Sequence, residues 1–133
     1  MSEPAFDQAR ADAALNALGS AILGDASYRD RPWDAIVLVF ELDGRTSDFG
    51  YVFGPGDAWE AEGPESWDVL TRAKEFREAT HVPGKPHWKK CLVRIERATG
   101  QIGIEFDYDG HRWVPDMADP EGFARQLRAP PKD

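Results

Sequence analysis

Hydrophobic residues alternate with other residues along positions 101–109, in the C-terminal third of the chain. The hydrophobic positions are Ile102, Ile104, Phe106 and Tyr108, and the others are Gln101, Gly103, Glu105, Asp107 and Asp109. Because successive side chains of a β-strand face opposite sides of a sheet, this alternation predicts a strand with one buried face and one acidic, solvated face. Residues 86–97 predict its partner strand, and Gly100 falls in the turn between them.

Two earlier segments also predict strands. Residues 33–42 are hydrophobic at almost every central position, so we expect this strand at the centre of the sheet, covered on both faces. The dipeptide Asp43-Gly44 favours a tight turn, and residues 45–53 predict the returning strand. The Gly-rich segment 54–57 lacks the Lys-Ser/Thr pair of a phosphate-binding loop, so we interpret it as a turn.

Two long segments have the three- to four-residue hydrophobic spacing of amphipathic helices. Residues 4–24 predict the first helix, with Ser2 as its cap and Pro4 in its first turn. Gly19 lies inside this helix and is interpreted as a point of close approach to the sheet. Residues 66–80 predict the second helix, which the Pro-rich and Gly-rich residues after it would end.

A short C-terminal helix is predicted over residues 119–128. Asp119 is a suitable cap, and a proline follows at the first helical position. We expect Phe123 and Leu127 to dock this helix onto the rest of the domain.

The predicted order of elements is therefore α-β-β-α-β-β-α. Such an order favours an α+β fold in which one mainly antiparallel, four-stranded sheet carries the helices on a face, as a two-layer domain. The 133 residues suffice for one domain, predicted over residues 1–128, and residues 129–133 are expected to form a frayed tail.

Composition adds a location and excludes some classes of function. No apolar run approaches the roughly 20 residues of a membrane span, and the N-terminus lacks the basic and apolar regions of a secretory signal. Cys91 is the one cysteine, which excludes a disulfide within the chain. These features predict a cytoplasmic protein without a membrane partner.

The net charge of −8 is distributed unevenly along the chain. Residues 1–70 hold 14 acidic and 4 basic residues, whereas residues 71–133 hold 10 acidic and 12 basic residues. A negative chain is a poor partner for nucleic acid, because phosphate backbones favour basic surfaces. An acidic half can instead attract a basic protein, although it is also typical of many solvated surfaces.

The sequence shows no pattern of a cofactor site, a metal site or a nucleophile. His87 and Cys91 would share a strand face but lie roughly 13 Å apart, which is too far for one zinc ion. Cys91 falls on an apolar strand face, where a thiol is usually inert. No Gly-x-Ser-x-Gly elbow is present. We therefore predict a protein without a cofactor or a metal, and one that is not an enzyme.

The carboxylates of the last strand are the main candidate site. Glu105, Asp107 and Asp109 would line one side of the strand at intervals of roughly 6.6 Å. Three interpretations stay open: a solvated sheet face, a docking face for a protein partner, and a pair of acid–base catalysts like those of glycoside hydrolases.

Tryptophans supply further candidates for contact with a partner. Trp59 and Trp113 lie in predicted loops and are candidate interface residues; for Trp59, closure of the edge of the core is the other interpretation, and it stays open. Asp57 and Glu60 flank Trp59 in an acidic connection and join the candidate set. The other three tryptophans, Trp33, Trp67 and Trp88, each open a predicted element and are interpreted as core residues.

Several of these positions together resemble the YezG-like immunity protein (antitoxin) family of bacteria. The matching residues are Trp33, Ile36 to Phe40, Phe53, Leu70, Phe76, Lys85-Pro86-His87-Trp88, Gly100 and Glu105-Phe106-Asp107-Tyr108-Asp109. The resemblance covers about residues 1–112, and its motifs are structural. It implies a small acidic cytoplasmic protein that neutralises a toxin, typically a nuclease, and it implies no catalytic residues.

Two hypotheses follow. In the first, the chain is an immunity protein that blocks a basic toxin through Glu105, Asp107 and Asp109, with a contribution from the tryptophan loops. In the second, it is a small hydrolase or ligand-binding domain that uses the same carboxylates around a pocket near Trp113. The oligomeric state and the role of residues 111–133 stay open.

Overall fold

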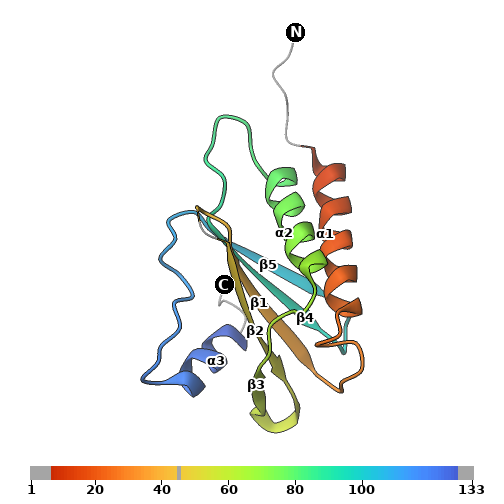
Figure 1. Ribbon diagram of the computed structural model, residues 1–133, viewed down its shortest axis with the longest axis vertical. Coiled ribbons are helices and arrows are strands. Elements are labelled where there is room, and N and C mark those ends of the chain that lie inside the picture. The colour runs from red at the N-terminus through yellow and green to blue at the C-terminus, as the bar shows by residue number, and fades with distance from the viewer. Residues whose placement is uncertain (1–6, 45, 129–133) are drawn as a thin grey trace.

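The computed structural model describes residues 7–44 and 46–128. Within them the chain forms three α-helices and one antiparallel sheet of five strands, in an α+β fold (Figure 1). The helices are α1 (Gln8–Gly24), α2 (Trp67–Ala79) and α3 (Pro120–Arg128). The strands are β1 (Ala35–Glu41), β2 (Ser47–Phe53), β3 (Trp59–Ala61), β4 (Lys90–Glu96) and β5 (Ile102–Asp107), and η1 (Pro55–Asp57) is one 3-10 turn.

The sheet has the order β3-β2-β1-β4-β5, so β1 is the central strand, as its apolar sequence predicts. Every neighbouring pair is antiparallel; Leu38 of β1, for example, lies between Gly50 of β2 and Val93 of β4. The prediction of four strands is wrong, because β3 adds a fifth. Three residues are too few to show an alternating pattern, and β3 lies within an acidic segment that resembles a loop.

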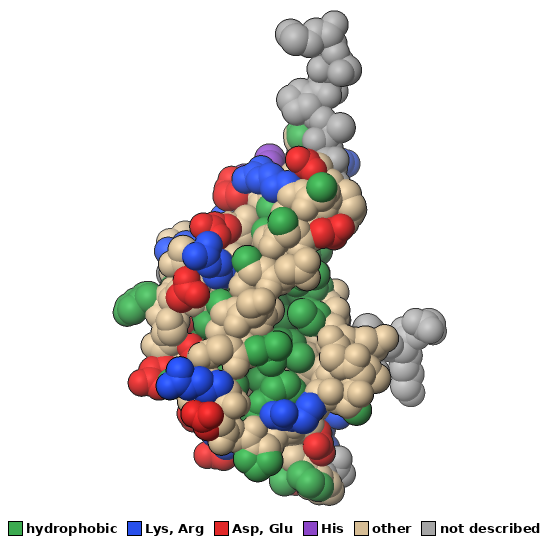
Figure 2. All heavy atoms as spheres, turned by 90° about the vertical axis from the view of Figure 1, so that its right-hand side faces the viewer, with side chains coloured by type: hydrophobic (Ala, Val, Ile, Leu, Met, Phe, Trp, Pro, Cys, Tyr) green, Lys and Arg blue, Asp and Glu red, His purple; other side chains and the backbone are tan. Residues whose placement is uncertain are grey.

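One face of the sheet is covered by α1 and α2, which lie side by side (Figure 1). Its core is built from alternate residues of the strands, among them Ile36, Leu38 and Phe40 of β1. A Cβ atom at Gly19 would lie 2.7 Å from Cδ1 of Ile102, so this glycine does permit α1 to approach β5 closely. The face of the molecule that carries α1 gathers hydrophobic side chains in its lower half (Figure 2).

The opposite face of the sheet is covered by α3, so the prediction of a two-layer domain is wrong. Phe123 and Leu127 of α3 are buried against Val37 and Leu92, which point away from α1 and α2. The docking residues predicted for α3 are confirmed. The sequence pattern of β1 already requires cover on both faces, and the chain meets this requirement with the helix that follows the last strand.

Helix ends follow the capping chemistry of the sequence. Asp119 accepts the N–H of Gly122 at the start of α3, as predicted, and Ser66 caps α2. Helix α1 begins later than predicted and is capped by Asp7, whereas Ser2 and Pro4 lie outside the described residues. The predicted tail, residues 129–133, also lies outside them. No helix among the described residues is long and apolar enough to cross a membrane.

Candidate functional site

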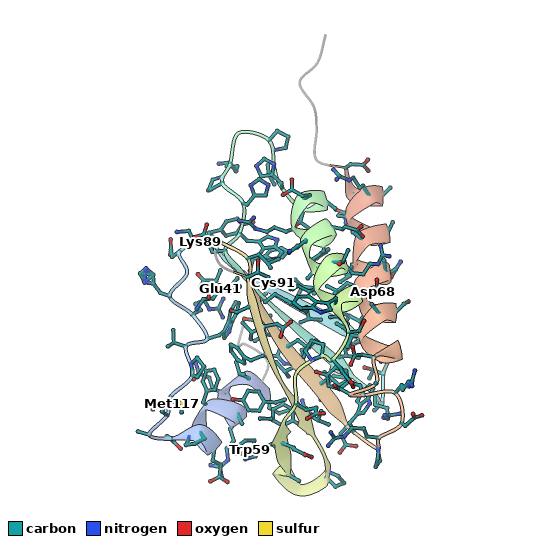
Figure 3. The ribbon with its side chains drawn as sticks, in the orientation of Figure 1. Glu41, Trp59, Asp68, Lys89, Cys91 and Met117 are labelled. Atoms are coloured by element: carbon teal, nitrogen blue, oxygen red, sulfur yellow. The ribbon has the colours of Figure 1, made fainter. Side chains whose placement is uncertain are left out.

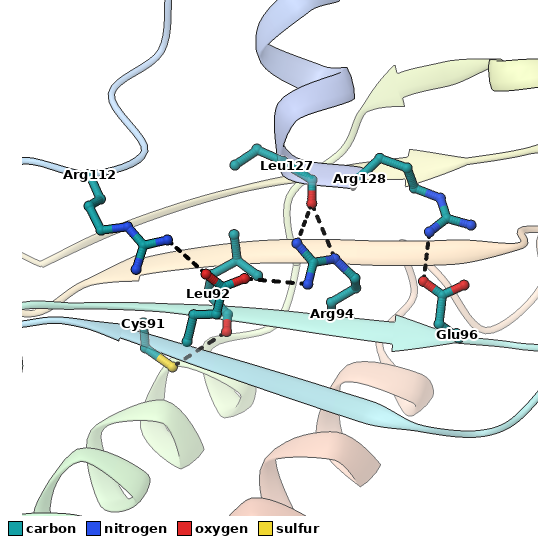
Figure 4. A network of polar contacts seen from close by, with 8 residues as sticks. Cys91, Leu92, Arg94, Glu96, Arg112, Leu127 and Arg128 are labelled. Atoms are coloured by element: carbon teal, nitrogen blue, oxygen red, sulfur yellow. Dashed lines mark hydrogen bonds and ion pairs between the residues drawn. The ribbon is translucent and has the colours of Figure 1, made fainter. Parts of the chain in front are cut away.

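The acidic face predicted on β5 is largely occupied by contacts within the chain. Glu105 lies between two arginines: Arg94 Nη1 is 3.4 Å from one carboxylate oxygen, and Arg112 Nη2 is 2.7 Å from the other (Figure 4). The Glu105 side chain is half-buried in this network. Asp109, beyond the end of the strand, is exposed. Of the three predicted carboxylates, Asp109 is therefore the most accessible to a partner.

Asp107 organises the turn after β5 and does not face solvent. Its side chain is buried, and its oxygens accept the backbone N–H groups of Asp109 at 3.1 Å and Arg112 at 2.8 Å. Desolvation alone would raise the pKa of Asp107, but these N–H groups, that of Gly110 and the charge of Lys90 outweigh it and hold the pKa below 3.8. The prediction of a solvated Asp107 is wrong, because the chain folds back over the end of β5.

Trp113 is buried, although it lies in an irregular segment. Residues 108–119, which we call the strap, connect β5 to α3. Trp113 points from the strap into the core between the sheet and α3. Its backbone is left-handed, with φ of 54°, and the guanidinium carbon of Arg112 lies 4.4 Å from the centre of its ring. The prediction of Trp113 as an exposed interface residue is therefore wrong; its ring fixes the strap to the sheet.

The other predicted contact residues surround β3. Trp59 is half-buried, pairs with Phe53 across the strands, and makes an edge contact with Tyr51 at 5.7 Å between ring centres. Glu60 is exposed and forms an ion pair with Arg31. The side chain of Asp57 lies outside what the structure describes. Trp59 and Glu60 thus remain reachable from solvent, at one edge of the sheet.

Trp67, which the sequence pattern assigns to the core, is the exposed tryptophan. It is 81% exposed, whereas Trp33, Trp88 and Trp113 are buried. The apolar stripe of α2 centres on Val69, Ala73 and Phe76; at about 100° per residue, Trp67 lies more than 100° around the helix from it. Trp67 does lie three residues before Leu70, as in an amphipathic helix. Leu70 itself, however, lies at the edge of the apolar stripe.

The residues around Trp67 are acidic and are held firmly. Glu65 and Asp68 are exposed on either side of it; we call these three side chains the Trp67 surface. The buried Asp25 accepts the N–H groups of Glu65 at 2.9 Å and Ser66 at 2.8 Å, so it fixes the chain where α2 begins. Ser66 then accepts the N–H of Asp68. The exposed indole is therefore presented from a rigid base.

The charge state of Asp25 is consistent with this fixing role. Burial would raise the pKa of Asp25, but the N–H groups of Glu65, Ser27 and Ser66 and the Ser27 hydroxyl lower it to below 3.8. Asp25 is thus an anion that holds backbone donors near the N-terminus of α2. It is bound to its own chain and is not available to a partner.

A cavity of about 490 Å³ lies beside Trp113, between the strap and strands β1, β2 and β4. Its walls include Val39, Phe49, Trp113, Val114, Glu41, Ser47 and Lys90. Lys90 is buried, and its Nζ donates to the carbonyl oxygen of Arg112 at 2.7 Å. The same Nζ lies 3.9 Å from Oε2 of Glu41. Neither Glu105 nor Asp107 lines this cavity, so the predicted pocket and the predicted carboxylates do not coincide.

Nucleophilic and metal chemistry gain no support from the described residues. Burial raises the pKa of the Cys91 thiol, which lies in the core between the sheet and helices α1 and α2 and is unsuited to form a thiolate. No group of three or more His, Cys, Asp or Glu side chains within residues 7–44 and 46–128 is placed to hold a metal ion.

Sequence reasoning missed the Trp67 surface for an identifiable reason. The position of Trp67 around the helix, measured against all the apolar residues of α2, indicates that its side chain is exposed. The three-residue spacing between Trp67 and Leu70, taken alone, suggests the opposite. The role of Asp25 has no local signal, because its partners Glu65 and Ser66 lie 40 and 41 positions along the chain.

Comparisons with known proteins do not assign the chain to a family. No protein-family model matches it, and a search of curated proteins finds no match.

Proposed function

We propose that the chain is an immunity protein, which binds a basic bacterial toxin in the cytoplasm and neutralises it by blocking its active site. The resemblance of the sequence to YezG-like proteins motivates this class and suggests that the toxin is a nuclease. The partner is recognised through the Trp67 surface, together with Glu60 and Asp109, in place of the carboxylates that β5 keeps for its own chain.

The exposure of Trp67 is the observation that carries this proposal. Burial of an indole on folding is strongly favourable, so a tryptophan that stays 81% exposed leaves a large apolar area for a partner. Tryptophan is also enriched among the residues that dominate binding energy at protein interfaces. Because Asp25 and Ser66 fix the local backbone, little conformational entropy is lost when a partner docks there.

The charge around Trp67 favours a basic partner. The segment from Asp57 to Asp68 contains five acidic residues and no basic residue. An arginine or lysine of a partner can stack on the face of the indole while it pairs with Glu65, or with the exposed Asp68, which already forms an ion pair with Arg72 at 3.4 Å. Nuclease surfaces are basic where they bind phosphate, so the same chemistry suits a nuclease toxin.

Co-expression with the toxin domain encoded beside its gene tests the proposal. Cells that carry the wild-type chain should survive expression of the toxin and yield a complex of the two proteins. Trp67→Ala should lose protection. Met117→Ala is the matched control, because Met117 is 88% exposed and lies on the opposite side of the molecule from Asp68 (Figure 3). If the wild-type chain neither protects cells nor binds the toxin, the proposal fails for that toxin.

A second candidate function is ligand binding in the cavity beside Trp113. The cavity combines apolar walls with the polar groups of Glu41, Ser47 and Lys90, as small-molecule sites commonly do. A thermal-shift screen tests this candidate: a compound that binds the cavity should raise the melting temperature of the wild-type chain. The same compound should have no effect on Ser47→Tyr, which fills the cavity; an equal shift in both proteins would contradict binding there.

A further inference from the structure

The cavity between the strap and the sheet has a polar end and an apolar end, and the register of the strands sets both. At the polar end, Ser47 of β2 lies opposite Glu41 of β1, and Glu41 lies opposite Lys90 of β4. Two residues away along the strands, Phe49 lies opposite Val39. Because side chains two residues apart on a strand share a face, these five side chains form one floor of the cavity.

The polar end contains an ion pair whose two groups are not joined by a hydrogen bond. Nζ of Lys90 lies 3.9 Å from Oε2 of Glu41, whereas N–H···O hydrogen bonds measure roughly 2.7–3.2 Å. Nζ donates to the carbonyl oxygen of Arg112, and it forms no second hydrogen bond among the described residues. An ammonium group has three N–H donors, so the buried Lys90 side chain has further donors for a ligand.

The carboxylate of Glu41 also has capacity to accept a hydrogen bond. Its Oε1 lies 3.4 Å from Oγ of Ser47, which is a long contact, and its side chain is half-buried. A ligand group that accepts from Lys90 and donates to Glu41 would supply two hydrogen bonds where the ion pair has none. A primary amide has both functions, because its C=O accepts and its neighbouring NH₂ donates.

The charges at the polar end favour a neutral ligand group over an ion. Lys90 lies between Glu41 and, on β5, the buried carboxylate of Asp107. An anion would be attracted by Lys90 and repelled by both carboxylates, whereas a cation would compete with Lys90 for Glu41. A neutral amide also loses less hydration energy than an ion when it enters a partly buried site.

The rest of the cavity suits an apolar body. Its apolar walls include Val39, Phe49, Trp113 and Val114. Val114 is 61% exposed, so a ligand that covers it removes apolar surface from water. The strap is held to the sheet because Arg112 accepts from Lys90 and donates its N–H to Asp107. The shape of the cavity is thus formed before a ligand binds, which lowers the entropy cost of binding.

We infer that this cavity binds a small neutral molecule that carries a primary amide on an apolar body. The amide C=O accepts from Lys90, its NH₂ donates to Glu41, and the apolar body lies over Val39 and Phe49, beneath the strap. The volume of about 490 Å³ falls within the roughly 300–1,000 Å³ that is usual for small-molecule sites. This ligand class rests on the second candidate function, ligand binding in the same cavity.

Three compounds with the same ring test the ligand class: benzamide is neutral, benzoate is an anion and benzylammonium is a cation. Each is titrated into the isotope-labelled full chain and followed by NMR. Benzamide should shift the signals of Val39, Gly110 and Val114 saturably, with a dissociation constant of about 1 mM or lower. Benzoate and benzylammonium should bind at least about tenfold more weakly.

The variant Glu41→Gln tests the charge at the polar end. It removes the charge of the carboxylate and keeps the shape of the side chain, so the affinity for benzoate should rise at least about threefold. Glu60→Gln is the matched control, because Glu60 is an exposed glutamate of β3 that does not line the cavity. It should change neither affinity. Circular dichroism verifies that both variants fold.

Three outcomes would overturn the ligand class. The first is that benzoate or benzylammonium binds as tightly as benzamide, which would leave the cavity a ligand site of different chemistry. The second is that benzamide shifts none of the cavity signals at concentrations up to about 10 mM. The third is an unchanged affinity for benzoate in Glu41→Gln, which would place the ligand away from Glu41.

These outcomes are separable from those of the proposed functions. The thermal-shift screen with Ser47→Tyr decides whether the cavity binds any compound, whatever its chemical class. Protection against a toxin depends on the Trp67 surface, none of whose residues line the cavity. Loss of the amide class would therefore leave the immunity function standing, and loss of the immunity function would leave the amide class standing.

Discussion

Two segments of this chain are fixed by the same device and present their tryptophans in opposite directions. At the start of α2, the buried carboxylate of Asp25 accepts backbone N–H groups, and Trp67 points into solvent. In the strap, the buried carboxylate of Asp107 accepts backbone N–H groups, and Trp113 points into the core.

The difference shows that local context alone does not decide whether a tryptophan is buried. Trp113 lies in an irregular segment, but this segment crosses a sheet face whose central strand needs cover. Trp67 lies in a helix, but at an angle that the helix does not bury. A fixed backbone with a buried ring stabilises the fold, whereas a fixed backbone with an exposed ring is suited to binding.

The largest effect on stability is expected for Trp113→Ala. Loss of a large buried aromatic side chain typically costs about 3–5 kcal/mol, which corresponds to a fall in melting temperature of about 10–20 °C for a domain of this size. Calorimetry measures this change. Trp113→Phe is the conservative control and should retain most of the stability. A change of less than about 1 kcal/mol for Trp113→Ala would show that the strap does not contribute to the core.

Replacement of the two fixing carboxylates should have intermediate effects. Asp25→Asn and Asp107→Asn each remove one of the two acceptor oxygens while donors stay buried, so each should cost about 1–3 kcal/mol in urea unfolding. Their effects on binding should differ. Under the proposed function, Asp25→Asn should weaken binding of the toxin because it loosens the base of Trp67, and Asp107→Asn should not. Equal effects on binding would contradict separate roles for the two segments.

The pH dependence of folding stability should show the contribution of the same two carboxylates. The pKa values of Asp25 and Asp107 are lower in the folded chain than in the unfolded chain, where aspartate titrates near pH 3.9. Their contribution to stability is therefore complete above about pH 4 and is lost as the pH falls through the lower, folded values. The Asp25→Asn/Asp107→Asn double variant should lose less stability than the wild type between about pH 4 and pH 2. Parallel pH profiles for the two proteins would contradict this assignment.

The smallest effect on stability is expected for Trp67→Ala. Because the indole is 81% exposed, its removal should change the free energy of unfolding by no more than about 0.5 kcal/mol. Urea unfolding of Trp67→Ala beside Trp113→Ala measures the contrast in one experiment. A loss comparable with that of Trp113→Ala would mean that Trp67 is part of the core.

The sequence predicts most of the architecture and less of the surface. The α+β class, the central position of β1, the cap Asp119 and the docking residues of α3 follow from hydrophobic period and capping chemistry. β3 is too short for a period, and the cover that α3 gives to the second face depends on the path of the strap. Glu105 and Asp107 fit an acidic strand face by sequence, but Arg94 and Arg112 reach this face from other parts of the chain and change its character.

The affinity of the Trp67→Ala variant for the proposed partner, a toxin encoded beside the gene, tests the central claim most directly. With the melting temperature unchanged, titration calorimetry should show a dissociation constant at least about 30-fold weaker than that of the wild type, as expected for a dominant interface residue. A variant that binds the toxin as tightly as the wild type would contradict the account, because Trp67 would then lie outside the surface that recognises the partner.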